Sequence, residues 1–207
     1  MNNKQVLDST DINCIFKLRD VLSQKIINAL NLNKEIVILC IGTDRSTGDS
    51  LGPLVGEKLK FLVRNNLYIY GNLGNPVHAK NLCSVLKTIN SELKNPFIIA
   101  IDACLGSLHN VGSIIIEEGP LSPGAAMDKD LPLVGNISIK GIVNISGTLE
   151  FLVLQNTRLN TVMQIADIIS KGLYHSILKT LGGPSIAKKT QNKLVKESKQ
   201  SKVDSNN

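Results

Sequence analysis

The chain has 207 residues, of which 43% are hydrophobic, 3% are aromatic and none is tryptophan. This length supplies one well-filled core and is short for two, so we expect a single domain built mainly from Ile, Leu, Val and Ala. The formal net charge is +6, with the basic residues gathered toward the C-terminal end. No apolar run reaches the ~18–20 residues that span a bilayer, and the first residues lack the order of a signal peptide. We therefore expect a cytoplasmic protein without a membrane segment.

The two ends of the chain differ in composition from its middle. Residues 1–12 are polar and are expected to be flexible, residues 13–184 to form the single α/β domain, and residues 185–207 to be a disordered basic tail. A basic tail attracts nucleic acid, but this tail has no interleaved aromatic residues, so we expect no specific nucleic acid binding. The four cysteines show no Cys-x-x-Cys spacing and are expected to be buried thiols.

Helical and strand patterns alternate along the first half of the chain. Apolar residues recur every three or four positions in the helical segments, whereas the strands are short, continuous apolar runs of the kind buried on both faces. The expected elements are helices over residues 14–32, 53–66 and 77–93 and strands over 35–40, 67–71 and 97–101.

The second half begins with two expected strands, over 111–119 and 134–144, joined by a loop rich in Pro and Gly. Segment 149–156 fits a helix or a strand, and 158–181 is a long amphipathic helix that Gly182 and the residues after it stop. Right-handed β–α–β crossovers place the carboxyl ends of parallel strands side by side. The predicted fold class is α/β, a three-layer sandwich with a twisted, mostly parallel sheet between helices.

The segment CIGTDRSTGDSLGPLVG follows the first predicted strand and holds four glycines and two aspartates. It lacks the Lys-Ser/Thr pair of a nucleotide-binding P-loop, and its aspartates, Asp44 and Asp49, would repel a polyphosphate. No Gly-x-Ser-x-Gly elbow supports a serine nucleophile. Asp49 lies near a helix start, where a carboxylate either caps the helix or serves as an acid–base residue.

Asp102 follows a buried apolar run, at the strand end where open α/β sheets bind ligands. An ordinary loop residue satisfied by backbone N–H groups is the alternative interpretation. Two carboxyl groups within ~4–6 Å of each other cannot both ionise cheaply, so one holds a proton while the other polarises a water. Asp49 and Asp102 are therefore candidates for a catalytic pair.

Other residues are candidate supports for this site. Arg45 and Lys129 could stabilise an oxyanion or hold an acidic substrate, and otherwise are solvated loop charges. Gly48 directly precedes Asp49 and would aim the carboxylate if its φ is positive. His78 precedes a predicted helix near the strand ends and is either a metal ligand or a surface residue. No His-x-x-His or Cys pair supports a tight metal site, so no metal and no cofactor is expected.

Five segments resemble the YyaC-type sporulation proteins of spore-forming bacteria, which are relatives of the germination protease that degrades small acid-soluble spore proteins. They are IGTDRSTGDSLGPLVGEKL, VHAKNL, FIIAIDACLG, PGAAMDKDLPLVG and GIVN, within about residues 37–170. The germination protease resembles the hydrogenase maturation endopeptidases in fold and is an atypical aspartic peptidase. Its catalytic aspartates lie in a loop before Leu-Gly-Pro and at the end of an Ile-Asp-Ala strand. These motifs fall on Asp49 and Asp102.

The resemblance implies an aspartic peptidase that cleaves a protein or peptide, such as small acid-soluble spore proteins, in the cytoplasm of the developing spore or its mother cell. The maturation endopeptidases hold nickel with two carboxylates and a histidine, and His78 is the candidate for that third position. The chain is shorter than the germination protease and has Thr47-Gly48 where that enzyme has Thr-Pro. The alternative is a catalytically silent sporulation factor that uses the same fold to bind a peptide or protein partner.

Overall fold

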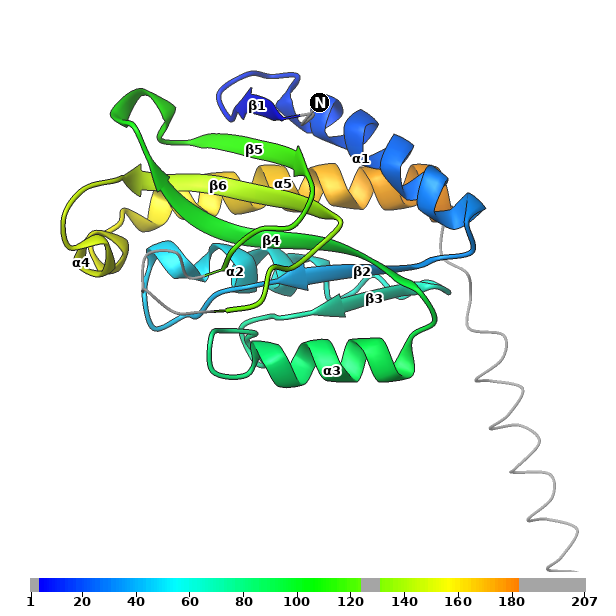
Figure 1. Ribbon diagram of the computed structural model, residues 1–207. Coiled ribbons are helices and arrows are strands. Elements are labelled where there is room, and N and C mark those ends of the chain that lie inside the picture. Colours follow the sequence, from blue (N-terminus) through cyan, green and yellow to red (C-terminus); the bar gives the residue numbers. More distant parts are fainter. Residues whose placement is uncertain (1–3, 124–130, 183–207) are drawn as a thin grey trace, which may run out of the picture.

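The computed structural model describes residues 4–123 and 131–182 and shows a six-stranded sheet between helices (Figure 1). The strands are β1 (Gln5–Asp8), β2 (Glu35–Cys40), β3 (Leu67–Tyr70), β4 (Pro96–Gly106), β5 (Ser113–Glu118) and β6 (Ile137–Ile145). The α-helices are α1 (Cys14–Asn31), α2 (Leu51–Leu59), α3 (Leu82–Glu92), α4 (Glu150–Gln155) and α5 (Leu159–Leu181), and two 3₁₀ turns are η1 (Gly48–Ser50) and η2 (Leu108–Asn110).

The sheet has the strand order β1-β5-β6-β4-β2-β3. Strands β3, β2, β4 and β6 run parallel to one another, and β5 and β1 continue the sheet in antiparallel pairs. Helices α1, α2 and α5 cover one face and α3 lies on the other (Figure 1). The predicted α/β class, with a mostly parallel sheet between two layers of helices, is confirmed.

The central strands bury side chains on both faces of the sheet. Along β2, Ile36 and Ile38 belong to the core beneath α1, α2 and α5, whereas Val37 and Leu39 belong to the core beneath α3. Successive side chains of a strand point to opposite faces, so a strand covered on both sides needs an unbroken apolar run. This requirement explains why the central strands could be predicted from continuous apolar runs, although polar and apolar residues do not alternate along them.

The structure differs from the sequence prediction in the edge strand β1 and in the length of the central strand β4. Strand β1, within the segment expected to be flexible, pairs with β5 and buries Leu7. Strand β4 does not end at Ile101 but continues to Gly106 beside β6. The ambiguous segment 149–156 contains helix α4. The predicted basic tail, 185–207, lies outside the described residues.

The ends of β2 and β4 lie where the winding of the chain reverses. From β2 the chain passes through α2 to β3 on one side, and from β3 it returns through α3 to β4 on the other side of β2. The loop after β2 leads to α2 on one face of the sheet and the segment after β3 leads to α3 on the other, so these two connections diverge beside the carboxyl-terminal part of β4. Open α/β sheets bind their ligands at such a point.

Candidate functional site

A cavity of about 1120 Å³ opens at the carboxyl ends of β2 and β4. Its lining comes from the loop after β2, the turn before α3, strands β4 and β6, and helix α4. The charged and polar residues that line it include Asp44, Arg45, Ser46, Asp49, His78, Lys80, Asp102, Lys140, Glu150 and Gln155. The cavity therefore brings together every predicted site residue except Gly48, which is buried beside it, and Lys129, which lies outside the described residues.

The loop that carries Asp49 is fastened to the sheet by its backbone. The N–H of Gly42 donates to the carbonyl oxygen of Val77 at 2.7 Å, and the N–H of Thr43 donates to the carbonyl oxygen of Asp49 at 3.0 Å. Asp49 lies within η1, while the residue that caps α2 is Ser50, whose side chain makes no capping hydrogen bond. The structure thus gives Asp49 no part as the cap of α2.

The Asp49 carboxyl is half-buried in the cavity wall. Burial raises the pKa of Asp49, and the neighbouring Ser46 hydroxyl opposes this rise only in part. The Ser46 hydroxyl is itself buried and makes no hydrogen bond of good geometry to a described residue. No described lysine or arginine forms an ion pair with Asp49. The site therefore favours the protonated form of Asp49 more than water does, which is the direction that an acid catalyst needs.

Asp102 lies inside β4, one residue beyond the last pairing with β2, Cys40 with Ile101. Its side chain points to the α3 face of the sheet, because Ile98 and Ala100 on the same strand do so. Its carboxyl oxygen Oδ1 accepts a hydrogen bond of 2.8 Å from the N–H of Ala103. The sequence predicted that Asp102 lies at the end of its own strand. It lies instead within β4, at the point where β2 leaves the sheet.

Lys140 is a cavity residue that sequence reasoning missed. It lies on β6 in register with Asp102, and its Nζ is 3.4 Å from Oε2 of Glu117 on β5. It is the charged residue in the otherwise uncharged strand ISIKGIVNI, a pattern that could have marked it.

Nearby, burial raises the pKa of Cys104 to about 11, which keeps this thiol protonated near neutral pH and unsuited to nucleophilic attack.

Two glycines shape the Asp49 loop by different means. Gly42 has φ +143°, and a Cβ atom there would lie 2.0 Å from the carbonyl oxygen of Asp49. Gly48 lies in η1 without a positive φ, so the condition under which its backbone would aim the Asp49 carboxylate is not met. A Cβ atom on Gly48 would instead meet Cδ2 of Leu154 in α4 at 2.7 Å. Gly42 allows the sharp turn, whereas Gly48 allows α4 to approach.

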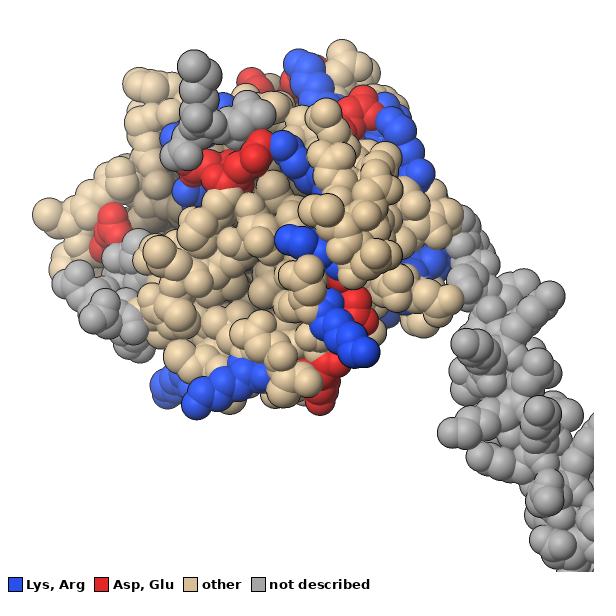
Figure 2. Space-filling view, turned by 45° about the vertical axis from the view of Figure 1, so that its right-hand side comes forward, with Lys and Arg blue, Asp and Glu red and all other residues tan. Residues whose placement is uncertain are grey.

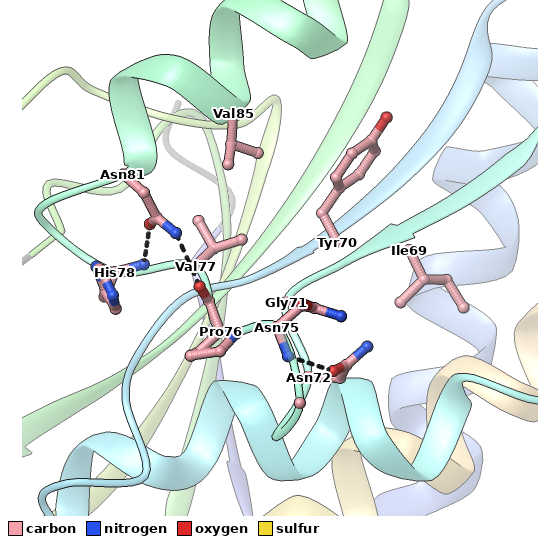
Figure 3. A pocket seen from close by; sticks show the side chains of 11 residues that line it. Ile69, Tyr70, Gly71, Asn72, Asn75, Pro76, Val77, His78, Asn81 and Val85 are labelled. Carbon is pink, nitrogen blue, oxygen red and sulfur yellow. Dashed lines mark hydrogen bonds between the residues drawn. The ribbon is translucent and has the colours of Figure 1, made fainter.

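His78 stands in the turn before α3 and lines both the large cavity and a smaller one of about 460 Å³, whose lining residues are drawn in Figure 3. The backbone N–H of His78 donates to Oδ1 of Asn81 at 2.8 Å, and Nδ2 of Asn81 donates to the carbonyl oxygen of Pro76 at 2.9 Å. The ring atom Nδ1 of His78 is buried without a partner among the described residues. Asn81 therefore fixes the turn, and His78 is part of the cavity wall rather than a surface residue.

A metal centre needs several ligands that converge. Within residues 4–123 and 131–182, no three His, Cys, Asp or Glu side chains are placed so that they could hold a metal ion. His78 and the two aspartates line one cavity but do not form such a group.

The described part of the chain contains no helix with both the length and the hydrophobicity to cross a bilayer.

The charged side chains on one face of the molecule are mixed in sign. Figure 2 shows both basic and acidic side chains on the described part of the face in view, with several of them next to one another. Nucleic-acid-binding surfaces typically carry a basic stripe along one face. The described side chains in this view are mixed in sign instead.

Replacing Asp49 by Asn should stabilise the fold at pH 7. Burial raises the pKa of Asp49 in the folded chain, so the folded state binds this proton more tightly than the unfolded state and loses stability as the pH rises through the folded pKa. The amide avoids this loss. The melting temperature of Asp49→Asn should exceed that of the wild type at pH 7, and the difference should shrink as the pH falls toward about 4.

The matched control for this prediction is Asp44→Asn, which removes a charge from the exposed part of the same loop. It should change the free energy of unfolding by no more than about 0.5 kcal/mol. Equal melting temperatures for wild type and Asp49→Asn at pH 7 would show that the buried carboxyl carries no cost.

The comparisons with known proteins give a family, a similar protein and a similar solved structure. Residues 6–172 match the model of the family described as "Protein of unknown function (DUF1256)". The uncharacterized protein YyaC of Bacillus subtilis (strain 168) is 51% identical over 170 residues, which is 82% of this chain and 82% of that protein. The crystal structure of the NiFe hydrogenase maturation protease HycI from Thermococcus kodakarensis KOD1 is similar with a TM-score of 0.46 and 20% identity, over 70% of this chain and 93% of HycI. By the first two matches, the chain belongs to the DUF1256 family.

Proposed function

We propose that the chain is a sporulation-associated peptidase of the atypical aspartic type, with Asp49 and Asp102 as its catalytic residues. The observation that carries this proposal is that these carboxyl groups, from separate elements, line one cavity at the point where the sheet reverses its winding. Such a crevice, with a few polar groups in a partly apolar wall, is typical of substrate sites. The raised pKa of Asp49 supplies the asymmetry that an acid–base pair needs.

The proposed reaction uses one aspartate as base and the other as acid. The Asp102 carboxylate takes a proton from a water, whose oxygen attacks the peptide carbonyl carbon, while protonated Asp49 gives its proton to the carbonyl oxygen. The gem-diol then returns a proton to Asp49. The C–N bond breaks, and the leaving nitrogen takes the proton held by Asp102. Both residues end in their starting states, and one water is consumed.

Two further features support these roles. Lys140 lies in register with Asp102 on the adjacent strand, where a cation attracts an ionised carboxylate. Arg45 lines the same cavity from an exposed position, suited to an acidic or oxyanionic group of the substrate. The segments around Asp49 and Asp102 also resemble the catalytic segments of the germination protease. We propose a protein substrate in the cytoplasm of the developing spore or mother cell, with small acid-soluble spore proteins as the first candidates.

The test is direct proteolysis. The purified chain is incubated with small acid-soluble spore proteins and, separately, with lysate from sporulating cells, and new termini are identified by mass spectrometry. The double variant Asp49→Asn with Asp102→Asn serves as the control preparation. Termini that appear only with the wild type support a peptidase. If the two preparations give the same termini, the chain is instead a silent factor that binds a peptide or protein.

Cleavage should continue in the presence of EDTA. In the proposed reaction a carboxylate activates the water, and the described residues form no cluster able to hold a metal ion. The rate of cleavage of a confirmed substrate is measured before and after dialysis against the chelator. Loss of the rate in EDTA and its return with nickel or zinc would contradict this prediction and make His78 a ligand.

A further inference from the structure

Strand β4 has an unpaired edge beside the proposed catalytic residues. Strand β2 pairs with β4 only as far as Cys40 and Ile101, and the N–H of Ile41 donates to the carbonyl oxygen of Ile101 at 2.8 Å. The chain then turns away, because Ile41 forms its next bridge with Val77. From Asp102 to Gly106, β4 pairs with β6 on its other side, and no strand among the described residues pairs with it on the side that β2 has left.

The backbone groups along this edge are those of alternate residues. Both main-chain groups of a strand residue point to the same side, and the side alternates along the strand. The carbonyl oxygen of Ile101 points toward β2 and that of Gly106 toward β6, where Ser146 donates to it. The main-chain N–H and C=O groups of Ala103 and Leu105 therefore point away from β6, toward the side of β4 that β2 has left.

These groups lack main-chain partners among the described residues. The N–H of Ala103 donates to the Asp102 carboxylate, but the carbonyl of Ala103 and both main-chain groups of Leu105 make no such bond toward the former β2 lane. Unpaired groups on a strand edge are the usual template for an added strand. An edge inside a solvent-accessible cavity is open to such a partner.

The cavity provides space and an apolar wall along this edge. Ala103 and Leu105 line it together with Asp49 on one side and with Phe151 and Leu154 of α4. The Phe151 side chain is 44% exposed, so it is free to cover an incoming apolar group. The volume of about 1120 Å³ is slightly above the range usual for small-molecule sites, which suits several residues of a chain.

We propose that the β4 edge over residues 102–106 binds an extended peptide by strand addition, with the peptide backbone paired to Ala103 and Leu105. Apolar side chains of the peptide pack against Leu105 and Phe151. In this position the peptide backbone passes Asp102, so the inference rests on the proposed function where it identifies the peptide as the substrate. It deepens that function by naming the substrate class: an unfolded or locally extended polypeptide segment, held mainly through its backbone.

The test uses a library of blocked octapeptides of random sequence and the Asp49→Asn, Asp102→Asn double variant, which cannot cleave them under the proposed mechanism. The tightest binder is then resynthesised with a single N-methyl group at each position in turn. Methylation at alternate positions should weaken binding about 10-fold, because each removes one backbone donor to the edge, while the intervening positions tolerate it. Absence of any enriched peptide, or equal losses at neighbouring positions, would overturn the proposal.

Amide hydrogen exchange gives a second readout that needs no further variant. The N–H of Leu105 should exchange at least about 10-fold more slowly when the selected peptide is bound, and unchanged exchange would count against the proposal. Failure of the two proposals can be told apart. Peptides that bind with the alternating pattern but are not cleaved by the wild type leave the edge site standing without the peptidase. Cleavage without the alternating pattern leaves the peptidase without the edge site.

Discussion

Replacement of Asp49 or Asp102 by Asn should lower the rate of peptide-bond cleavage by about 10²–10⁴-fold and leave the chain folded. The amide keeps the size of the side chain but neither accepts a proton from water nor supplies one to the carbonyl. Both residues are partly exposed in a cavity wall, so the substitution removes charge without opening a void in the core. The rate is measured on the substrate identified by its new termini, and the fold by circular dichroism and melting temperature.

The double variant should be little slower than the slower single variant, because residues that act in one step are not additive. The matched control is Asp167→Asn. It removes a carboxylate of α5 that pairs with Lys58 of α2 and does not line the cavity. Its cleavage rate should equal that of the wild type. Cleavage at the wild-type rate by either single variant would remove that residue from the mechanism.

The sequence was sufficient for the layers of the fold because parallel strands need continuous apolar runs. Strands β2 and β4 were predicted from such runs, and α5 from its long helical periodicity. Strand β1 could not be predicted in this way, since its four residues bury only Leu7 and its pairing with β5 joins distant parts of the chain. Short edge strands depend on tertiary pairing more than on local pattern.

The same distinction applies to the candidate site. The sequence made Asp49 and Asp102 candidates because each follows an apolar run, and the sheet brings strand ends together. The sequence could mark Lys140 as the charged residue of an otherwise uncharged strand, but it could not place this residue beside Asp102, because that depends on the register between β6 and β4. Nor could it separate the glycines of the loop, because spacing alone does not show which backbone passes close to which. The close approach is visible only when the loop is folded against α2 and α4.

Of Gly42 and Gly48, the two glycines of the loop between β2 and α2, Gly42 makes the closer backbone approach. Directly after β2 the chain turns with φ +143° at this residue, and the backbone carbonyl of Asp49 lies against its α-carbon. The hydrogen bond from Thr43 to that same carbonyl holds the two ends of the loop together. The conformation that places Asp49 in the cavity wall therefore depends on the absence of a side chain at position 42.

Gly42→Ala should consequently destabilise the chain by about 2–5 kcal/mol and reduce cleavage by more than the loss of folded protein explains. The new Cβ would lie 2.0 Å from the carbonyl oxygen of Asp49 and 3.0 Å from Cδ of Pro53, so the loop must shift and carry the Asp49 carboxyl with it. Denaturant unfolding measures the first effect, and cleavage per folded molecule the second. The control is Gly147→Ala, where a Cβ meets nothing within 4 Å and the change in stability should stay below about 1 kcal/mol. If Gly42→Ala unfolds and cleaves like the Gly147 variant, the loop tolerates a side chain at its turn, and the position of Asp49 does not depend on Gly42.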